Sequence, residues 1–243
     1  MDKRVRSGIP KLDRLIEGGY PKNSVILVLG GPGTGKTTFA LQYIYNGAKN
    51  GEPGVFVSFE QEPEQLKNSM RKFGLDFAKL EKQKKAIILR MKNVKDITDV
   101  LKTIDKNVKK IKAKRLVIDS LSSIEIFAST YKSIIKSVPA WVLKEKLTLV
   151  SEQKTIIRKL IYEIIDHFKG LKVTTLLTSE SEDAQHSGYS IAEYIVDGII
   201  ELSSSVIGKN FQRNIVVIKM RDTKIEGVPH EFQITSKGIK IVD

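Results

Sequence analysis

The chain has 243 residues, 41% of them hydrophobic and 28% charged, and these values predict one α/β domain over residues 1–243. It contains no cysteine, which excludes disulfide bonds and thiolate metal sites. The first residues lack the apolar stretch of a signal peptide, and no run approaches the ~20 apolar residues of a membrane span, so we expect a cytoplasmic protein without a membrane partner.

The first elements lead into a short buried strand. A turn and a short helix are predicted over 7–16, followed by a loop over 18–23. Residues 25–29 are an unbroken apolar run that indicates a buried parallel strand. Residues 30–37 come next and read Gly-Gly-Pro-Gly-Thr-Gly-Lys-Thr. A helix is predicted to follow, from Thr37 to near Gly47.

Residues 30–37 fit the pattern G-x-x-x-x-G-K-[ST] of phosphate-binding loops. Glycines let successive backbone N–H groups point at one anion, and the helix that follows adds its positive N-terminal end. The predicted ATP-binding residues are Gly31, Pro32, Gly33, Thr34, Gly35, Lys36, Thr37 and Thr38. Lys36 would reach the β- and γ-phosphates, and the Thr37 hydroxyl would bind Mg²⁺. The other interpretation is a glycine-rich turn between a strand and a helix.

A second strand is predicted over 55–59, and Glu60 follows it directly. Side chains at the carboxyl ends of parallel strands lie where α/β sheets bind ligands. Glu60 is therefore placed to polarise a water molecule aimed at the γ-phosphate, although strand-end carboxylates commonly just face solvent. Pro63 then opens a helix that ends at Gly74.

The next segments contain a lysine-rich helix. A third strand is predicted over 86–89, and a helix begins near Asp96 with apolar residues at helical spacing. The opposite face of this helix carries Lys102, Lys106, Lys109, Lys110 and Lys112. Such a stripe is more often a solvated face than a binding site.

Residues 115–120 form the second strong signal. An apolar strand that ends in Asp119 is what a Walker B element requires, because a carboxylate at this position can hold Mg²⁺ through water. The pattern is common by itself, and it gains weight from the glycine loop upstream. We expect Thr37 and Asp119 to form the Mg²⁺ site.

The remaining chain contains two regions without a clear pattern. Residues 121–150, which include the only tryptophan, Trp141, are predicted to be an insertion with short helices. A helix from Ser151 to Gly170 and a strand over 173–179 follow, and the strand tip Ser179-Glu180 should lie near the γ-phosphate. The polar stretch 181–190 is predicted to be a mobile loop.

A short helix over 191–196 and four further strands are predicted at the C-terminal end. The strands cover 197–202, 214–219, 231–234 and 239–242, and the close spacing of the last three indicates an antiparallel end to the sheet. The three histidines have no metal-ligand spacing, so no metal site is assigned to them.

Five stretches of the sequence together resemble the KaiC type of RecA-superfamily ATPase. They are residues 7–13, 30–37, 56–63, 117–122 and 219–223. The resemblance implies a P-loop NTPase with a RecA-like core, a mostly parallel sheet flanked by helices, and a homo-oligomeric, commonly hexameric, ring with ATP between subunits.

The resemblance also assigns roles to single residues. Glu60 matches the first of two adjacent glutamates, the general base, whereas Gln61 replaces the second. Lys219 and Arg221 match a basic pair that reaches the nucleotide site of the neighbouring subunit, where Arg221 would act as an arginine finger. Asp222 stands where the family usually has glycine, so the local turn is expected to differ.

The net charge of +13 leaves a second interpretation open. A recombinase paralog could bind single- or double-stranded DNA through the loop 181–190 and use its ATPase in support. A lysine-rich surface typical of heat-adapted proteins explains the charge without nucleic acid. A signalling scaffold that binds ATP and hydrolyses it very slowly is a third interpretation.

Overall fold

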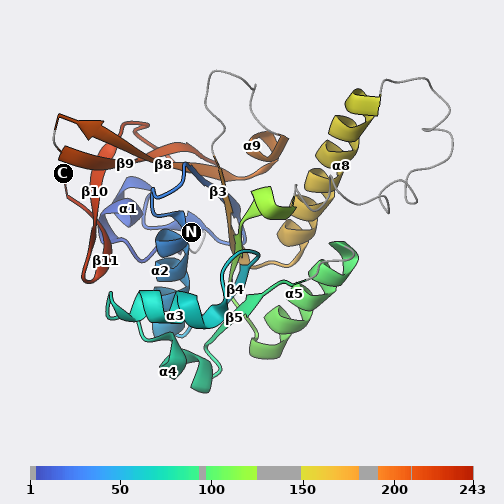
Figure 1. Ribbon diagram of the computed structural model, residues 1–243, viewed down its shortest axis with the longest axis horizontal. Helices are drawn as coiled ribbons and strands as arrows, with labels where there is room; N and C mark the ends of the chain where they lie inside the picture. The colour runs from blue at the N-terminus through green and yellow to red at the C-terminus, as the bar shows by residue number, and fades with distance from the viewer. Residues whose placement is uncertain (1–3, 93–96, 125–148, 181–190, 209, 243) are drawn as a thin grey trace.

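A sheet of nine strands forms the centre of the computed structural model (Figure 1). The structure describes residues 4–92, 97–124, 149–180, 191–208 and 210–242. The strand order is β11-β10-β9-β8-β3-β7-β6-β4-β5, and β1 pairs with β2 in a separate two-stranded sheet. The strands are β1 Arg4–Val5, β2 Tyr20–Pro21, β3 Val25–Gly30, β4 Gly54–Ser58, β5 Ala86–Arg90, β6 Arg115–Asp119, β7 Thr174–Ser179, β8 Gly198–Ile207, β9 Asn210–Met220, β10 His230–Thr235 and β11 Gly238–Ile241.

Helices cover both faces of this sheet (Figure 1). They are α1 Pro10–Leu15, α2 Lys36–Lys49, α3 Pro63–Arg71, α4 Phe77–Lys82, α5 Ile97–Ile111, α8 Leu149–Gly170 and α9 Ile191–Ile195. The face with α1 to α4 and the face with α5, α8 and α9 each have their own hydrophobic cluster. The fold is a three-layer α/β/α sandwich, which confirms the predicted sheet flanked by helices.

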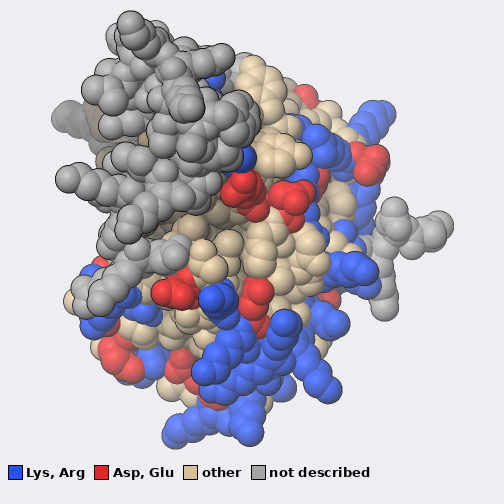
Figure 2. Space-filling view, turned by 90° about the vertical axis from the view of Figure 1, so that its right-hand side faces the viewer, with Lys and Arg blue, Asp and Glu red and all other residues tan. Residues whose placement is uncertain are grey.

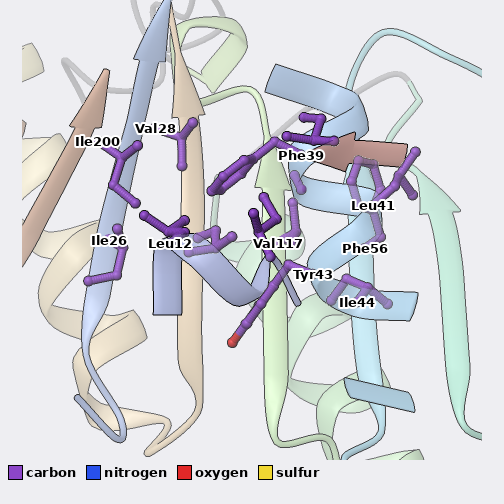
Figure 3. Packing of buried hydrophobic residues seen from close by; sticks show 14 of the residues in the cluster. Leu12, Ile26, Val28, Phe39, Leu41, Tyr43, Ile44, Phe56, Val117 and Ile200 are labelled. Atoms are coloured by element: carbon purple, nitrogen blue, oxygen red, sulfur yellow. The ribbon is translucent and has the colours of Figure 1, made fainter. Parts of the chain in front are cut away.

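Alternation along each parallel strand explains the two clusters. In β3, Ile26 and Val28 pack toward α1 and α2, whereas Val25, Leu27 and Leu29 belong to the cluster on the α5 and α8 side. A strand buried on both faces must be apolar throughout, which is why its sequence is an unbroken run. Figure 3 shows the first face, where residues of α1 and α2 meet the central strands.

The strands β3 to β8 are parallel, and the pairs β8–β9, β9–β10 and β10–β11 that complete the sheet are antiparallel. The predicted antiparallel end is therefore confirmed. Strands β8 and β9 are longer than predicted, because their outer parts, residues 203–207 and 210–213, are mostly polar and lack the apolar pattern used to find them. The two-residue strands β1 and β2 and the short helix α4 were missed, since such short elements contain too few residues for any periodicity to appear.

Some predictions fall outside the described residues. Most of the insertion predicted at 121–150 does so, Trp141 included, and only residues 121–124 and the start of α8 are described there. The whole loop 181–190 does so as well. Within the described residues, no helix is both long and apolar enough to span a bilayer.

Candidate functional site: a phosphate loop beside two acidic strand tips

The loop between β3 and α2 has the backbone that its glycines require. Gly33 and Gly35 have φ angles of 75° and 105°, in the left-handed region that favours glycine. The Thr34 hydroxyl donates to the Gly31 carbonyl at 2.8 Å and closes the turn. At Gly30, a β-carbon would overlap the carbonyl oxygen of Leu202 and the Thr34 hydroxyl. The loop thus adopts a compact curled backbone directly before the N-terminus of a fourteen-residue helix.

Lys36, the first residue of α2, folds back over this loop. Its Nζ atom donates to the carbonyl oxygens of Gly30 at 2.6 Å and Gly31 at 3.0 Å. Burial lowers the pKa of Lys36, and the carboxylates of Glu180, Asp119 and Glu60 oppose that shift. The ammonium group is held by carbonyl acceptors of its own loop. Oxygen atoms of a bound phosphate could replace these acceptors.

Thr37 and Asp119 meet across the sheet edge. The Thr37 hydroxyl donates to Oδ2 of Asp119 at 2.9 Å, and Thr178 donates to Oδ1 at 2.5 Å. Strand β7, which carries Thr178, lies between β3 and β6. Burial raises the pKa of Asp119, and the hydrogen bonds from Thr178 and Thr37 partly offset this effect. The sequence-based interpretation did not assign a role to Thr178.

Glu60 lies two residues beyond β4, on a turn stabilised by Ser58. The Ser58 hydroxyl accepts the backbone N–H groups of Glu60 at 3.3 Å and Gln61 at 2.9 Å. The carboxylate oxygen Oε1 accepts the hydroxyl of Ser123 at 3.1 Å and that of Ser120 at 3.4 Å. Glu60 is itself exposed. Its carboxylate therefore has a defined direction and access to water, which a general base needs.

The strand tip Ser179-Glu180 joins the same edge. The hydroxyls of Ser122 and Ser179 lie 3.0 Å apart, and the backbone N–H of Glu180 donates to the Ser122 hydroxyl at 3.0 Å. The structure thus places the tips of β4, β6 and β7 beside the loop after β3. Neither the two serines that contact Glu60 nor Ser122 could be assigned from the sequence, because a serine after a strand has no specific pattern.

Lys219 and Arg221 lie at the other end of the sheet from their own phosphate loop. Arg221 donates its backbone N–H to Asp197, whose own N–H donates to Val25 at the start of β3. Gly30, at the end of β3, is five residues further along the strand, a distance of about 16 Å. The Lys219 ammonium donates to the carbonyls of Glu193 and Tyr194, while the Arg221 side chain pairs with Asp197 at 3.1 Å.

Two further observations concern Lys219 and the turn that follows Arg221. Burial lowers the pKa of Lys219, and the nearby Arg221 and Lys169 act in the same direction. Asp222, expected to change the turn, has a φ angle of 52°, which is the left-handed conformation that favours glycine. An aspartate therefore occupies a glycine-type backbone conformation here.

The oxygen donors at the loop suit Mg²⁺. Mg²⁺ prefers hard oxygen ligands and is commonly held by one or two protein groups together with phosphates and water. Thr37 and Asp119 offer a hydroxyl and a carboxylate that already contact each other. Within the described residues there is no group of three His, Cys, Asp or Glu that could hold a metal alone. The pair therefore fits a metal that arrives with a nucleotide.

The fold and this edge define a P-loop nucleoside triphosphatase with a RecA-like core. The chain belongs to the KaiC family of ATPases, because the KaiC family model matches residues 5–150 and 145–243.

The chain is also similar to named relatives over nearly its whole length. The chain is 32% identical to a UPF0273 protein of Thermotoga maritima, and the match covers 99% of this chain and 96% of the relative. It is also 32% identical to the UPF0273 protein MJ1359 of Methanocaldococcus jannaschii, over 98% of this chain and 95% of the relative. Among solved structures, the KaiC-like protein PH0186 of Pyrococcus horikoshii OT3 is similar over 100% of both chains, with 36% identity and a TM-score of 0.79.

Proposed function

We propose that this protein binds ATP with Mg²⁺ at residues 30–37 and hydrolyses it. The observation that carries the proposal is the hydrogen bond between Thr37 and Asp119, formed beside Lys36. A hydroxyl and a carboxylate in contact at the N-terminus of the helix after a glycine loop are the groups that a Mg²⁺–nucleotide complex requires.

The residues have distinct roles in this proposal. The loop backbone and Lys36 bind the phosphates, and Thr37 and Asp119 hold the Mg²⁺, which neutralises charge on the phosphate oxygens when bound. Glu60 accepts a proton from the attacking water, since its carboxylate is exposed and fixed by two serine hydroxyls. The nucleotide-binding set is Gly31, Pro32, Gly33, Thr34, Gly35, Lys36, Thr37 and Thr38.

Arg221 and Lys219 complete the site of a neighbouring subunit in this proposal. Their position about 16 Å along the sheet from their own loop leaves an arginine side chain too short to reach the phosphates in the same chain. A ring with head-to-tail interfaces, as the predicted hexamer would have, brings the opposite ends of two subunits together. Arg221 would then stabilise charge in the transition state.

The first experiment tests nucleotide binding and turnover. Lys36→Ala should abolish ATP hydrolysis and weaken ATP binding, because the ammonium that contacts the phosphates is gone. Lys49→Ala is the matched control, since it removes a lysine from the last turn of the same helix. Undiminished hydrolysis by purified Lys36→Ala protein would refute the site assignment.

The second experiment tests whether sites are shared. Glu60→Gln and Arg221→Ala should each be inactive alone. Mixed in equal amounts and allowed to exchange subunits, they should recover activity, because about a quarter of random head-to-tail interfaces combine an intact Glu60 with an intact Arg221. Each variant alone at the same total concentration is the control. Absence of recovery, with exchange demonstrated by labelled subunits, would count against shared sites.

The recombinase alternative has less support. It relied on the loop 181–190, which lies outside the described residues, and on the net charge of +13. Single- and double-stranded DNA therefore remain predicted partners without structural support at that loop. A cytoplasmic location is likewise still a prediction from the sequence.

A further inference from the structure

The positive charge of this protein is concentrated in one stretch. Residues 79–115 contain fourteen lysines and arginines against four aspartates and glutamates, so they carry +10 of the net charge of +13. This stretch covers the end of α4, strand β5, helix α5 and the start of β6. The excess of positive charge therefore lies in this part of the fold and is not spread evenly over the surface.

The strand register brings the two ends of this stretch together. Ala86 on β5 and Arg115 on β6 both pair with Gly54 on β4, which lies between them. Adjacent strands are about 4.8 Å apart, so Lys85 and Lys114, each one residue earlier, lie within roughly 10 Å of each other. Helix α5 ends just before Lys112. The C-terminal ends of α4 and α5, which lie on opposite faces of the sheet, thus both reach the edge where the parallel strands begin.

Eight of these lysines form what we call the lysine face. Its members are exposed: Lys82, Lys84, Lys102, Lys106, Lys109, Lys110, Lys112 and Lys114. Figure 2 views the side of the molecule that carries α5 and shows basic side chains gathered at its lower end. Among the described residues, none of the eight forms an ion pair.

Two of the four acidic residues of the stretch have partners outside this face. Glu81 pairs with Lys67 of α3, and Asp105 contacts His167 of α8 at 2.9 Å. Both carboxylates are therefore turned toward other partners. A cluster of like charges destabilises the folded state through self-repulsion and attracts an anionic ligand of matching extent.

We propose that the lysine face binds the phosphate backbone of double-stranded nucleic acid without sequence preference. Lys102, Lys106 and Lys109 follow each other at helical spacing on α5, about 6 and 4.5 Å apart along the helix axis. A duplex presents a phosphate charge for each ~1.7 Å of its axis, so several such lysines can each neutralise a phosphate.

The amino-acid composition of this part of the chain favours a duplex over other polyanions as the ligand. Residues 79–115 contain no Phe, Tyr or Trp, which single-stranded nucleic acid needs for base stacking. Arg90 pairs with Glu62, and Arg115 is buried against Glu52, so neither arginine is available to read base edges. The large hydrophobic side chains that are exposed lie on other segments, which argues against insertion into a membrane.

The face is also separate from the nucleotide site. Its members Lys82, Lys84, Lys109, Lys110, Lys112 and Lys114 lie toward the edge where the parallel strands begin, and Lys102 and Lys106 lie further along α5, whereas residues 30–37 follow the end of β3. It does not involve the loop 181–190 on which the recombinase interpretation relied. The proposal therefore stands whether or not the protein hydrolyses ATP.

The test measures duplex binding by fluorescence anisotropy in the absence of ATP. The protein is titrated onto two labelled 24-base-pair DNA duplexes of unrelated sequence, from ~50 to ~300 mM salt. Both duplexes should bind with equal affinity, and the logarithm of the association constant should fall linearly with the logarithm of salt concentration. Absence of binding at ~50 mM salt, or a tenfold preference for one sequence, would overturn the proposal.

The decisive variant removes three charges from α5. Lys102→Gln, Lys106→Gln and Lys109→Gln combined should weaken duplex binding at ~100 mM salt by more than about tenfold and reduce the salt slope by up to ~3, because each phosphate contact contributes about 0.9 to that slope. Gln is a good helix former, so α5 should remain folded.

The control carries the same change of charge elsewhere. Lys159→Gln, Lys237→Gln and Lys240→Gln replace three lysines that are exposed but lie outside the lysine face, and this triple variant should bind the duplex like the wild type. Equal losses in both triple variants would show a general charge effect and contradict the proposal. Binding of polyglutamate, or of vesicles with anionic lipids, through the same lysines would also contradict the proposal if no duplex binding is seen.

Discussion

The Thr37 hydroxyl donates a 2.9 Å hydrogen bond to Oδ2 of Asp119 and so joins the first turn of α2 to the tip of β6. The second carboxylate oxygen is engaged too, because Thr178 on the intervening strand β7 donates to Oδ1 at 2.5 Å. Asp119 is therefore oriented from both sides by hydroxyl groups of the same chain. In the proposed ATPase, Thr178 is a positioning residue for the Mg²⁺ site.

Replacing Thr178 tests this orientation. Thr178→Val keeps the shape of the side chain and removes the hydroxyl, whereas Thr178→Ser keeps the hydroxyl. Residues that orient metal ligands typically contribute 10–100-fold to metal affinity, so we expect Thr178→Val to raise the Mg²⁺ concentration for half-maximal ATP turnover by at least about tenfold. Thr178→Ser should need a Mg²⁺ concentration for half-maximal turnover close to that of the wild type. Identical Mg²⁺ titrations for both variants would contradict the role of the hydroxyl.

The two serine hydroxyls on Glu60 give a second prediction. Ser123→Ala removes the 3.1 Å hydrogen bond to Oε1 and leaves only the 3.4 Å contact from Ser120. If Glu60 is the general base, the variant should lower kcat by roughly tenfold and leave KM unchanged, against a loss of about 10²–10⁴ for Glu60→Gln.

A double-mutant cycle separates positioning from a general loss of structure. In the Glu60→Gln background, Ser123→Ala should lower kcat no further, because there is no longer a base to position. Ser123→Thr, which keeps a hydroxyl, should remain close to wild type. An equal fractional loss in both backgrounds would show that Ser123 acts independently of Glu60.

The phosphate loop could be predicted from sequence because its chemistry is local. Eight consecutive residues supply the turn, the ammonium and the hydroxyl, and the strand before them is apolar because both of its faces are buried. The contacts of Thr178, Ser120 and Ser123 could not be predicted in this way, since they depend on the order β3-β7-β6-β4. Strand order is a property of the packed sheet. The sequence around a single serine or threonine at a strand end does not indicate which strand lies next to it.

Asp13 gives a prediction for pH. It is 9% exposed, and its carboxylate accepts the backbone N–H of Ser7 at 2.6 Å. Burial raises the pKa of Asp13 above 3.8, although the hydrogen bonds from Ser7 act in the other direction. A carboxyl group that holds its proton more tightly in the folded state favours folding when it is protonated. This contribution is complete below pH 3.8 and is lost as the pH rises through the folded pKa.

Asp13→Asn keeps an acceptor for Ser7 and removes the charge. The free energy of unfolding of the wild type, relative to this variant, should therefore rise as the pH falls from 7 toward 4. Urea unfolding of both proteins at several pH values measures the difference, and general acid effects cancel between them. A relative stability that falls with pH would mean that the pKa of Asp13 is lowered.

Arg115, the first residue of β6, is the largest buried side chain of the described structure. It is 2% exposed, and its guanidinium donates to Glu52 and to the backbone carbonyl of Tyr43. It also lies over the Tyr43 ring, 4.4 Å from the ring centre. A buried charge is tolerated only when it is paired and hydrogen-bonded, so this site depends on its close packing. Gly47 of α2 provides the space, because a β-carbon there would overlap the Nε and Cδ atoms of Arg115.

Gly47→Ala should therefore destabilise the protein, although alanine is normally the better helix residue. Inside an exposed helix this substitution stabilises by roughly 0.5–1 kcal/mol, but here the methyl group must displace a buried arginine from its partners, which costs about 3 kcal/mol or more. Gly170→Ala is the matched control, because a β-carbon at the end of α8 meets nothing within 4 Å. Urea denaturation should show a lower midpoint for Gly47→Ala and an unchanged or higher one for Gly170→Ala. Two equal midpoints would show that Arg115 can move away without cost, and the guanidinium would then contribute little to the stability of β6 and α2.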